Sequence, residues 1–288
     1  MVIKLKQDKM HLINKIFKNE TIRTVWDKDE EKYYISVIDI VGVLSESDNP
    51  RNYWKVLKHR LRKEGNESVT NCNQLKLKSL DGKYYNTDVT DIEGMFRIIE
   101  SIPSKNAEPI KQWLAKLGSM RIDEIFDPSI SVQRGIDIYR AKGYDEAWIQ
   151  KRIKGMQDRK KLTDVWKDGG IKEGKEFAIL TNEIYKGWSG MTAKEFKQFK
   201  GLRKESLRDN MSDIEVTLAD LGEIATREIA KKQNPKGMDE NIEVARRGGK
   251  IANNVRKDLE NELGESVITQ NNTLNYKYQD ETKQIDNN

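Results

Sequence analysis

The stretch that decides the N-terminal fold is SDNPRNYWKVLKHRLRKEG, residues 47–65. The three residues before Pro50 are all suitable N-caps, and proline suits the first helical turn, where a missing N–H costs nothing. Gly65 is a suitable place for the chain to leave the helix. The sequence therefore predicts a helix that begins at Pro50 and ends shortly before Gly65.

The predicted helix has two different faces when it is wound at about 100° per residue. One face carries the large apolar side chains of Trp54, Leu57 and Leu61. A separate stripe is entirely basic and consists of Arg51, Lys55, Lys58 and Arg62. We expect the helix to pack on the domain through the Trp54 face and to present the basic stripe outward, free for phosphates.

The basic stripe has two possible interpretations. Like charges spaced i,i+3 and i,i+4 mildly destabilise an isolated helix, and nucleic-acid phosphates would relieve that repulsion. Phosphate contacts position a protein without reading sequence, whereas Arg51 and Asn52, near the helix start, could reach base edges. The alternative is an ordinary solvated face, because basic helix faces are common.

The composition narrows the classes of function. The chain has 288 residues, with 52 Lys and Arg against 47 Asp and Glu, and a formal net charge of +5. This mild excess of bases permits nucleic-acid binding without requiring it. Cys72 is the only cysteine, which excludes an internal disulfide and a thiolate zinc site, and there are only two histidines. We therefore predict no catalytic residue, no metal and no cofactor.

The chain has no features of a membrane or secreted protein. No apolar run approaches the roughly eighteen residues of a spanning helix. The N-terminal sequence lacks the apolar core and cleavage site of a secretory signal. These features predict a cytoplasmic protein with no membrane partner.

Two hairpins are expected in the first part of the chain. Residues 22–26 and 32–37 are rich in β-branched and aromatic residues and are separated by an acidic turn. A second hairpin is expected around a two-residue Asp81-Gly82 turn. Helices should follow each hairpin, the last of them ending at Gly118.

The rest of the chain shows only helical periodicity beyond about residue 128. Thr192 with Glu195 and Ser212 with Glu215 fit capping boxes at helix starts. We predict an α+β domain at residues 1–125, an all-α domain at 126–268 and a disordered polar tail at 269–288.

The first part of the sequence resembles the Bro-N domain, the N-terminal module of the BRO family that phage antirepressors share. The resemblance rests on IRTVW…KYYISVIDIVGVL, NPRNYWKVLKHRL, the Asp-Gly hairpin and DIEGMFRIIESIPSKNAEPIKQWL, and covers roughly residues 15–120. Its most specific part lies between Glu93 and Trp113. The resemblance implies that the N-terminal module binds DNA.

The second half resembles the C-terminal region of the DNA-damage-inducible protein D family. The similar stretches are EGKEFAILTNEIYKG, GMTAKEFKQFKGL, LADLGEIATREIAKKQNPKG and ENIEVARRGGKIANNVRKDLE. This resemblance implies a cytoplasmic regulator linked to a prophage or to DNA damage. Such a protein would act on DNA or on the recombinase filament that forms on single strands.

Two further sites have competing interpretations. Arg246, Arg247 and Lys250 surround Gly248-Gly249, where a backbone could approach a phosphate, although the glycines could equally mark a helix bend. Residues 173–175 fit the E-x-K of metal-dependent nucleases and follow two aspartates, Asp164 and Asp168. That chemistry needs adjoining strands around a metal, and here the surroundings are helical.

The sequence thus leads to a non-enzymatic, DNA-binding regulator of the antirepressor type. The candidate DNA-binding residues are Arg51, Asn52, Lys55, Lys58, Arg62, Arg246, Arg247 and Lys250. Its partners would be double- or single-stranded DNA, a repressor or recombinase filament, and a second copy of the chain. The alternatives are a protein-interaction module that makes no DNA contact and a metal-dependent nuclease.

Overall fold

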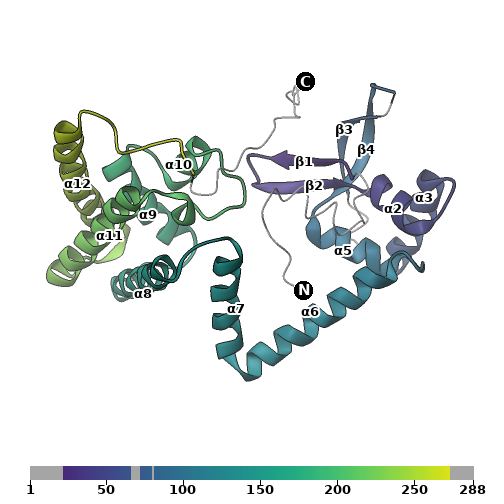
Figure 1. The fold of residues 1–288 in the computed structure, drawn as a ribbon, viewed down its shortest axis with the longest axis horizontal. Coiled ribbons are helices and arrows are strands. Elements are labelled where there is room, and N and C mark those ends of the chain that lie inside the picture. The colour runs from purple at the N-terminus through teal and green to yellow at the C-terminus, as the bar shows by residue number, and fades with distance from the viewer. Residues whose placement is uncertain (1–21, 66–71, 80, 273–288) are drawn as a thin grey trace. The chain divides into compact units, whose positions relative to one another are not determined.

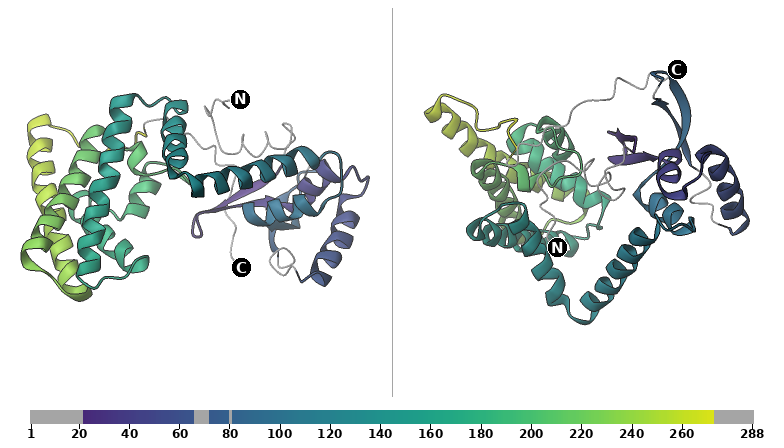
Figure 2. Two further views of the ribbon diagram at one scale, coloured as in Figure 1. Left: turned by 90° about the horizontal axis from the view of Figure 1, so that it is seen from below. Right: turned by 45° about the vertical axis from the view of Figure 1, so that its right-hand side comes forward.

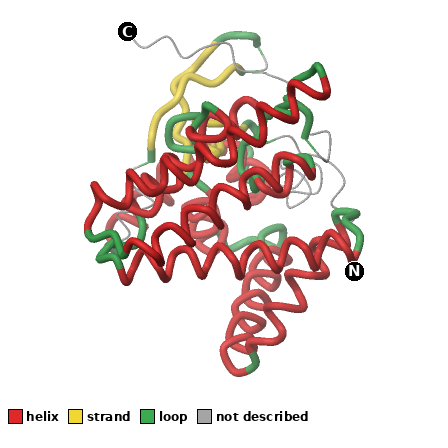
Figure 3. The backbone as a smooth tube through the Cα atoms, turned by 90° about the vertical axis from the view of Figure 1, so that its left-hand side faces the viewer, coloured by secondary structure: helices red, strands yellow, loops and turns green. Residues whose placement is uncertain are grey.

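The computed structural model describes residues 22–65, 72–79 and 81–272, and the chain forms two compact units (Figure 1). The boundary between the units falls after Ile138, within helix α7 (Pro128–Ala141), later than the position expected from sequence. All four described strands lie in the first unit (Figure 3). The first unit is therefore α+β and the second is all-α, as the sequence predicted.

The first unit contains one antiparallel sheet with the strand order β1-β2-β4-β3. The strands are β1 (Thr24–Asp27), β2 (Lys32–Ser36), β3 (Asn73–Lys78) and β4 (Tyr84–Thr90). Both predicted hairpins are confirmed, but the second turn is wider than expected. Ser79 N–H donates to Lys83 O and Gly82 N–H donates to Ser79 O, so three residues lie between Ser79 and Lys83. Gly82 has φ +79°, which suits a glycine at the end of this turn.

Three helices of the first unit share one apolar core with strand β2. They are α2 (Val37–Ser45), α3 (Pro50–Lys63) and α5 (Ile92–Ser101). Asn49 caps α3 by accepting from Asn52 N–H, and Asp91 caps α5 in the same way. The core contains Trp54, Leu57 and Leu61 of α3. The predicted helix and its buried face are therefore confirmed.

Helix α6 (Glu108–Phe126) is one long helix (Figure 2). It includes Gly118, so the expected stop at that glycine is wrong. A glycine ends a helix when the chain must turn into the left-handed region, and Gly118 stays helical. Trp113 of α6 contacts Phe96 of α5. In α6 beyond Trp113, Glu124 is the only fully buried side chain, and α7 has none.

The second unit is a packed group of helices. They are α8 (Glu146–Asp168), α9 (Lys175–Ser189), α10 (Ala193–Phe199), the short 3₁₀ helix η1 (Arg208–Asn210), α11 (Asp213–Gln233) and α12 (Gly237–Leu263). The capping boxes at Thr192 and Ser212 are both present. The core is rich in aromatic side chains, including Trp166, Trp188 and Phe196.

Glycines allow α12 to lie close against α9 and α11. The expected bend at Gly248-Gly249 is wrong, because α12 is continuous there and both glycines are buried. A methyl group on Gly249 would lie 2.6 Å from Ile184 O, and one on Gly248 would lie 2.8 Å from Gly222 O. These glycines therefore serve helix packing.

The chain after α12 packs back onto the second unit. Val267 is buried, and Thr269 N–H donates to Glu215 Oε1. The Lys200 ammonium is fully buried, lies 2.8 Å from Glu215 Oε2, and donates to the carbonyls of Thr269 and Asn271. The predicted disordered tail therefore does not begin at residue 269, and its remainder, residues 273–288, lies outside the described residues.

Candidate nucleic-acid interface

The outward side of α3 carries most of the predicted basic stripe. Arg51, Asn52, Lys55 and Arg62 are all exposed. Helix α3 contains no acidic residue. Within the described parts of the chain, Arg51, Lys55 and Arg62 form no salt bridge. Their charges are therefore available to an acidic partner.

Lys58 differs from the other three bases of the stripe. Its ammonium lies 2.9 Å from Asp88 Oδ2 on strand β4, and the side chain is three-quarters buried. The expectation that all four bases point freely outward is therefore wrong for Lys58. A helical wheel places Lys58 beside Lys55 but contains no information about a carboxylate on a strand packed against the helix.

Asp88 anchors α3 to the β3–β4 hairpin. Its carboxylate accepts hydrogen bonds from Trp54 Nε1 at 2.8 Å, Lys58 Nζ at 2.9 Å and Gln74 Nε2 at 2.9 Å. Burial by itself raises the pKa of Asp88, but these three donors outweigh it and leave the pKa below its ordinary value of 3.8. The anchor fixes the orientation of α3 and hence the direction of its basic side chains.

The β3–β4 hairpin adds a second basic element that the sequence reasoning missed. Strand β2 pairs with β4 only at Val89 and Thr90, so the rest of the hairpin extends beyond the sheet (Figure 1). Lys76 and Lys78 are exposed and lie two and four residues after Gln74 on β3. Side chains two residues apart on a strand point to the same face, so both lysines share the face on which Gln74 contacts Asp88. The alternation of leucine with polar and basic residues in QLKLK, residues 74–78, could have predicted that these lysines share one face of a strand.

The hairpin also carries exposed side chains near its turn. Lys83 and Tyr84 are exposed, and the Tyr85 hydroxyl donates to Asp81 Oδ2 at 2.7 Å. That hydrogen bond raises the pKa of Tyr85 and lowers that of Asp81. We call the exposed bases of α3 and of the Gln74 face of the hairpin the basic surface, defined by Arg51, Lys55, Arg62, Lys76 and Lys78.

The two arginines of the second predicted basic site bind neighbouring side chains, but only Arg246 is paired with a carboxylate. Arg246 Nε lies 2.7 Å from Glu183 Oε2, and Arg247 Nη1 donates to Gln233 Oε1 at 2.9 Å. Lys250 is exposed. The hypothesis that Gly248-Gly249 admits a phosphate is wrong, because α9 and α11 occupy that space.

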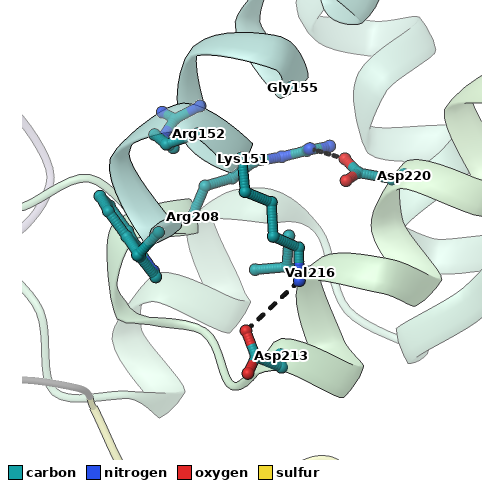
Figure 4. Close-up of a pocket in the computed structure, with 8 residues that line it drawn as sticks. Lys151, Arg152, Gly155, Arg208, Asp213, Val216 and Asp220 are labelled. Carbon is teal, nitrogen blue, oxygen red and sulfur yellow. Dashed lines mark hydrogen bonds and ion pairs between the residues drawn. The ribbon is translucent and has the colours of Figure 1, made fainter. Parts of the chain in front are cut away.

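An ion-pair network joins α8, η1 and α11 in the second unit (Figure 4). Arg208 pairs with Asp220 and with Glu223, and Arg152 Nε lies 2.7 Å from Asp209 Oδ1. Burial alone would lower the pKa of Arg208, but Tyr185 and the two carboxylates raise it. The guanidinium therefore stays charged and ties these elements together.

A cavity of about 350 Å³ opens beside this network. Its lining includes Arg159, Thr181 and Tyr185. Arg159 Nη1 lies 2.8 Å from Glu223 Oε1, so its charge is already balanced. The other two arginines of the lining, Arg152 and Arg208, pair with Asp209 and Asp220, so each arginine at the cavity has a carboxylate partner, unlike the bases of the basic surface.

The E-x-K sequence lies in the turn before α9. Glu173 is exposed and forms a salt bridge with Lys167, and that bond lowers the pKa of Glu173. No strand adjoins the sequence in the described second unit. Among the described residues, no group of three or more His, Cys, Asp or Glu is placed to hold a metal ion. The E-x-K residues therefore lack the setting that nuclease chemistry needs.

Comparisons with known families agree with this organisation. Residues 21–122 match the family model of the BRO family N-terminal domain, Bro-N. The first unit is therefore a Bro-N domain. Residues 143–276 match the family model of the DinD C-terminal domain, which lies in the second unit. No curated protein matches the chain.

These two domains confirm both resemblances expected from the sequence. The combination supports a regulatory protein of the antirepressor type. None of the described helices has a segment both long and apolar enough to cross a membrane.

Proposed function

We propose that this protein is a non-enzymatic regulator that binds DNA through the basic surface of its Bro-N domain. The observation that carries the proposal is the α3 face, where three exposed bases stand without an acidic neighbour on their own helix. The lysines of the β3–β4 hairpin extend that charge. A helix and a two-stranded ribbon are both elements that fit the major groove of DNA.

The arrangement of α3 also favours DNA as the acidic partner. Helices α2 and α3 are joined by the short segment between Ser45 and Pro50, and the second helix carries the bases. In helix-turn-helix proteins the second helix enters the major groove and its first residues contact base edges. Arg51 and Asn52 occupy that position on α3.

In this proposal the second unit binds a protein partner. The Glu183 carboxylate balances the charge of Arg246, and Arg247 is held in place by the neutral Gln233 amide, whereas the exposed bases of α3 form no salt bridge within the described residues. The family resemblance favours a repressor or a recombinase filament as that partner, in a prophage or DNA-damage response. A module that acts on protein alone is the competing function.

Salt dependence of binding tests the proposal. The affinity of the full chain for duplex DNA is measured against salt concentration for the wild type and for Arg51→Ala/Lys55→Ala/Arg62→Ala. Each phosphate that a base neutralises contributes about 0.9 to the magnitude of the log–log slope, so the slope of the triple variant should be smaller by about 2.7. Single-stranded DNA is measured in parallel, where each neutralised phosphate contributes about 0.7.

The matched control removes the same charge from the second unit. Lys175, Lys232 and Lys257 are exposed, and their replacement by alanine changes net charge equally. The control should retain the wild-type slope. Equal slopes for the wild type and the α3 variant, with the variant folded, would refute DNA binding through α3 and favour the protein-only module.

A further inference from the structure

The second half of α6 exposes large apolar side chains and buries an acidic one. The exposed fractions of Ile122, Ile125 and Phe126 are 56%, 68% and 84%. Glu124, in contrast, is fully buried against Arg121 and Arg134, at 2.9 Å and 2.8 Å. A helix that faces water normally hides its apolar residues and exposes its acids. This pattern indicates that another surface covers the apolar side.

Large apolar side chains are exposed along α6 and α7. Eight of them are Trp113, Leu117, Ile122, Ile125, Phe126, Ile130, Val132 and Ile138. When α6 is wound at about 100° per residue, Ile122, Ile125 and Phe126 lie on one side of the helix, and Trp113 and Leu117 lie on the opposite side. The exposed parts of Ile122, Ile125 and Phe126 total on the order of 400 Å².

We propose that the outer face of α6 binds the same face of a second copy, with the two helices antiparallel. The outer face comprises Ala115, Gly118, Ser119, Ile122, Ile125 and Phe126. Its small residues come first and its large residues come last. An antiparallel partner places the large side chains of each copy over the small ones of the other. A two-fold interface requires this self-complementarity.

Gly118 fits the centre of such a pair. It lies inside an exposed stretch of helix, and a methyl group built there would contact nothing within 4 Å. Glycine in a helix interior costs about 0.5–1 kcal/mol relative to alanine, and no close contact in the described chain compensates for it. Close approach of a second helix gives this glycine a role, because a glycine lets two backbones come together.

The charges along α6 support the antiparallel arrangement. Lys111 and Lys116 lie in the first half of the helix, and Asp123 lies in the second. With the two-fold axis between Gly118 and Ser119, Lys116 of one copy lies within about one helical turn, 5.4 Å, of Asp123 of the other. A parallel pair would instead set like charges side by side.

Sedimentation and light scattering of the full chain test the interface. The wild type should be a dimer at micromolar concentration, and Ile122→Glu/Phe126→Glu should be a monomer with unchanged helix content. Val255→Glu, at a similarly exposed apolar residue on α12, is the matched control and should remain a dimer. A monomeric wild type, or a dimer that survives the α6 changes, would overturn the proposal.

Cross-linking tests the register and serves even if the charged variant does not fold. In a Cys72→Ser background, Ser119→Cys should give a disulfide-linked dimer on mild oxidation, because the two copies meet there. Gln112→Cys should not, since antiparallel pairing separates the two copies of residue 112 by about 20 Å along the helix. Cross-linking at both positions or at neither would contradict the antiparallel two-fold. These outcomes do not depend on DNA binding.

Discussion

Replacing Gly187 with alanine should separate two helices of the second unit. Gly187 lies on α9, where a methyl group would be 2.7 Å from Gly249 Cα and 2.9 Å from Gly249 C on α12. Carbon atoms in ordinary contact lie about 3.5–4.0 Å apart, so the methyl group would be about 1 Å too close to these atoms. Both opposing atoms are backbone, so no side-chain rotation can relieve the clash.

The expected cost follows from two opposing effects. Overpacking a close contact typically costs about 1–3 kcal/mol, and a backbone-to-backbone clash belongs at the upper end. Alanine recovers about 0.5–1 kcal/mol because it is the better helix former. The net loss should be about 2 kcal/mol, which corresponds to a fall in Tm of about 5–10 °C for a unit of this size.

Calorimetry of the full chain measures this effect, and Gly155→Ala is its control. Gly155 lies inside α8 of the same unit, and a methyl group there would contact nothing within 4 Å. That change should therefore raise the stability by about 0.5–1 kcal/mol. A Gly187→Ala variant that melts at or above the wild-type temperature would refute the close packing of α9 on α12.

Three other measurements test the first unit. Trp54→Ala removes a buried aromatic and a donor to Asp88, so it should cost about 3–5 kcal/mol of stability; little change in Tm would contradict the burial of Trp54. Because the pKa of Asp88 is lowered in the folded protein, its carboxylate stabilises the fold at pH values above the ordinary pKa of 3.8, and this stabilisation is lost as the pH falls through the lower folded pKa. Asp88→Asn should therefore flatten the decline of Tm in acid, and an unchanged profile would argue against the anchor. Burial raises the pKa of Cys72 to about 11, so alkylation should be slow at neutral pH and accelerate toward pH 11, whereas rapid labelling at pH 7 would contradict that environment.

Local signals in the sequence predicted much of the fold correctly. Asn49 and Pro50 mark the start of α3, and the spacing of Trp54, Leu57 and Leu61 identifies its buried face. Capping depends on residues within one turn of the helix end, so a sequence carries the information directly. The capping boxes at Thr192 and Ser212 were predictable for the same reason.

The wrong predictions involve contacts between distant segments. Glycine permits a helix end, a bend or a close helix contact, and only the neighbouring helix distinguishes these for Gly248 and Gly249. The pairing of Lys58 depends on Asp88, thirty residues later on a strand. The basic hairpin was missed because its hydrophobic alternation predicts a strand but not how far that strand extends beyond the sheet. The assignment of DNA-binding residues stays a prediction.

The hydrogen bonds of the buried Lys200 to Thr269 and Asn271 make the resistance of the second unit to proteolysis depend on the segment after α12. A protease that removed residues from 269 onward would take away the carbonyls of Thr269 and Asn271, which accept from the Lys200 ammonium. Leaving a buried polar group short of partners costs about 1–3 kcal/mol, and a domain has only about 5–15 kcal/mol to lose. The unfolded population would rise by roughly 5-fold to 140-fold, because each 1.4 kcal/mol is a factor of ten. One cut near the C-terminus would thus speed further digestion of the helical unit, because proteases act on the unfolded population.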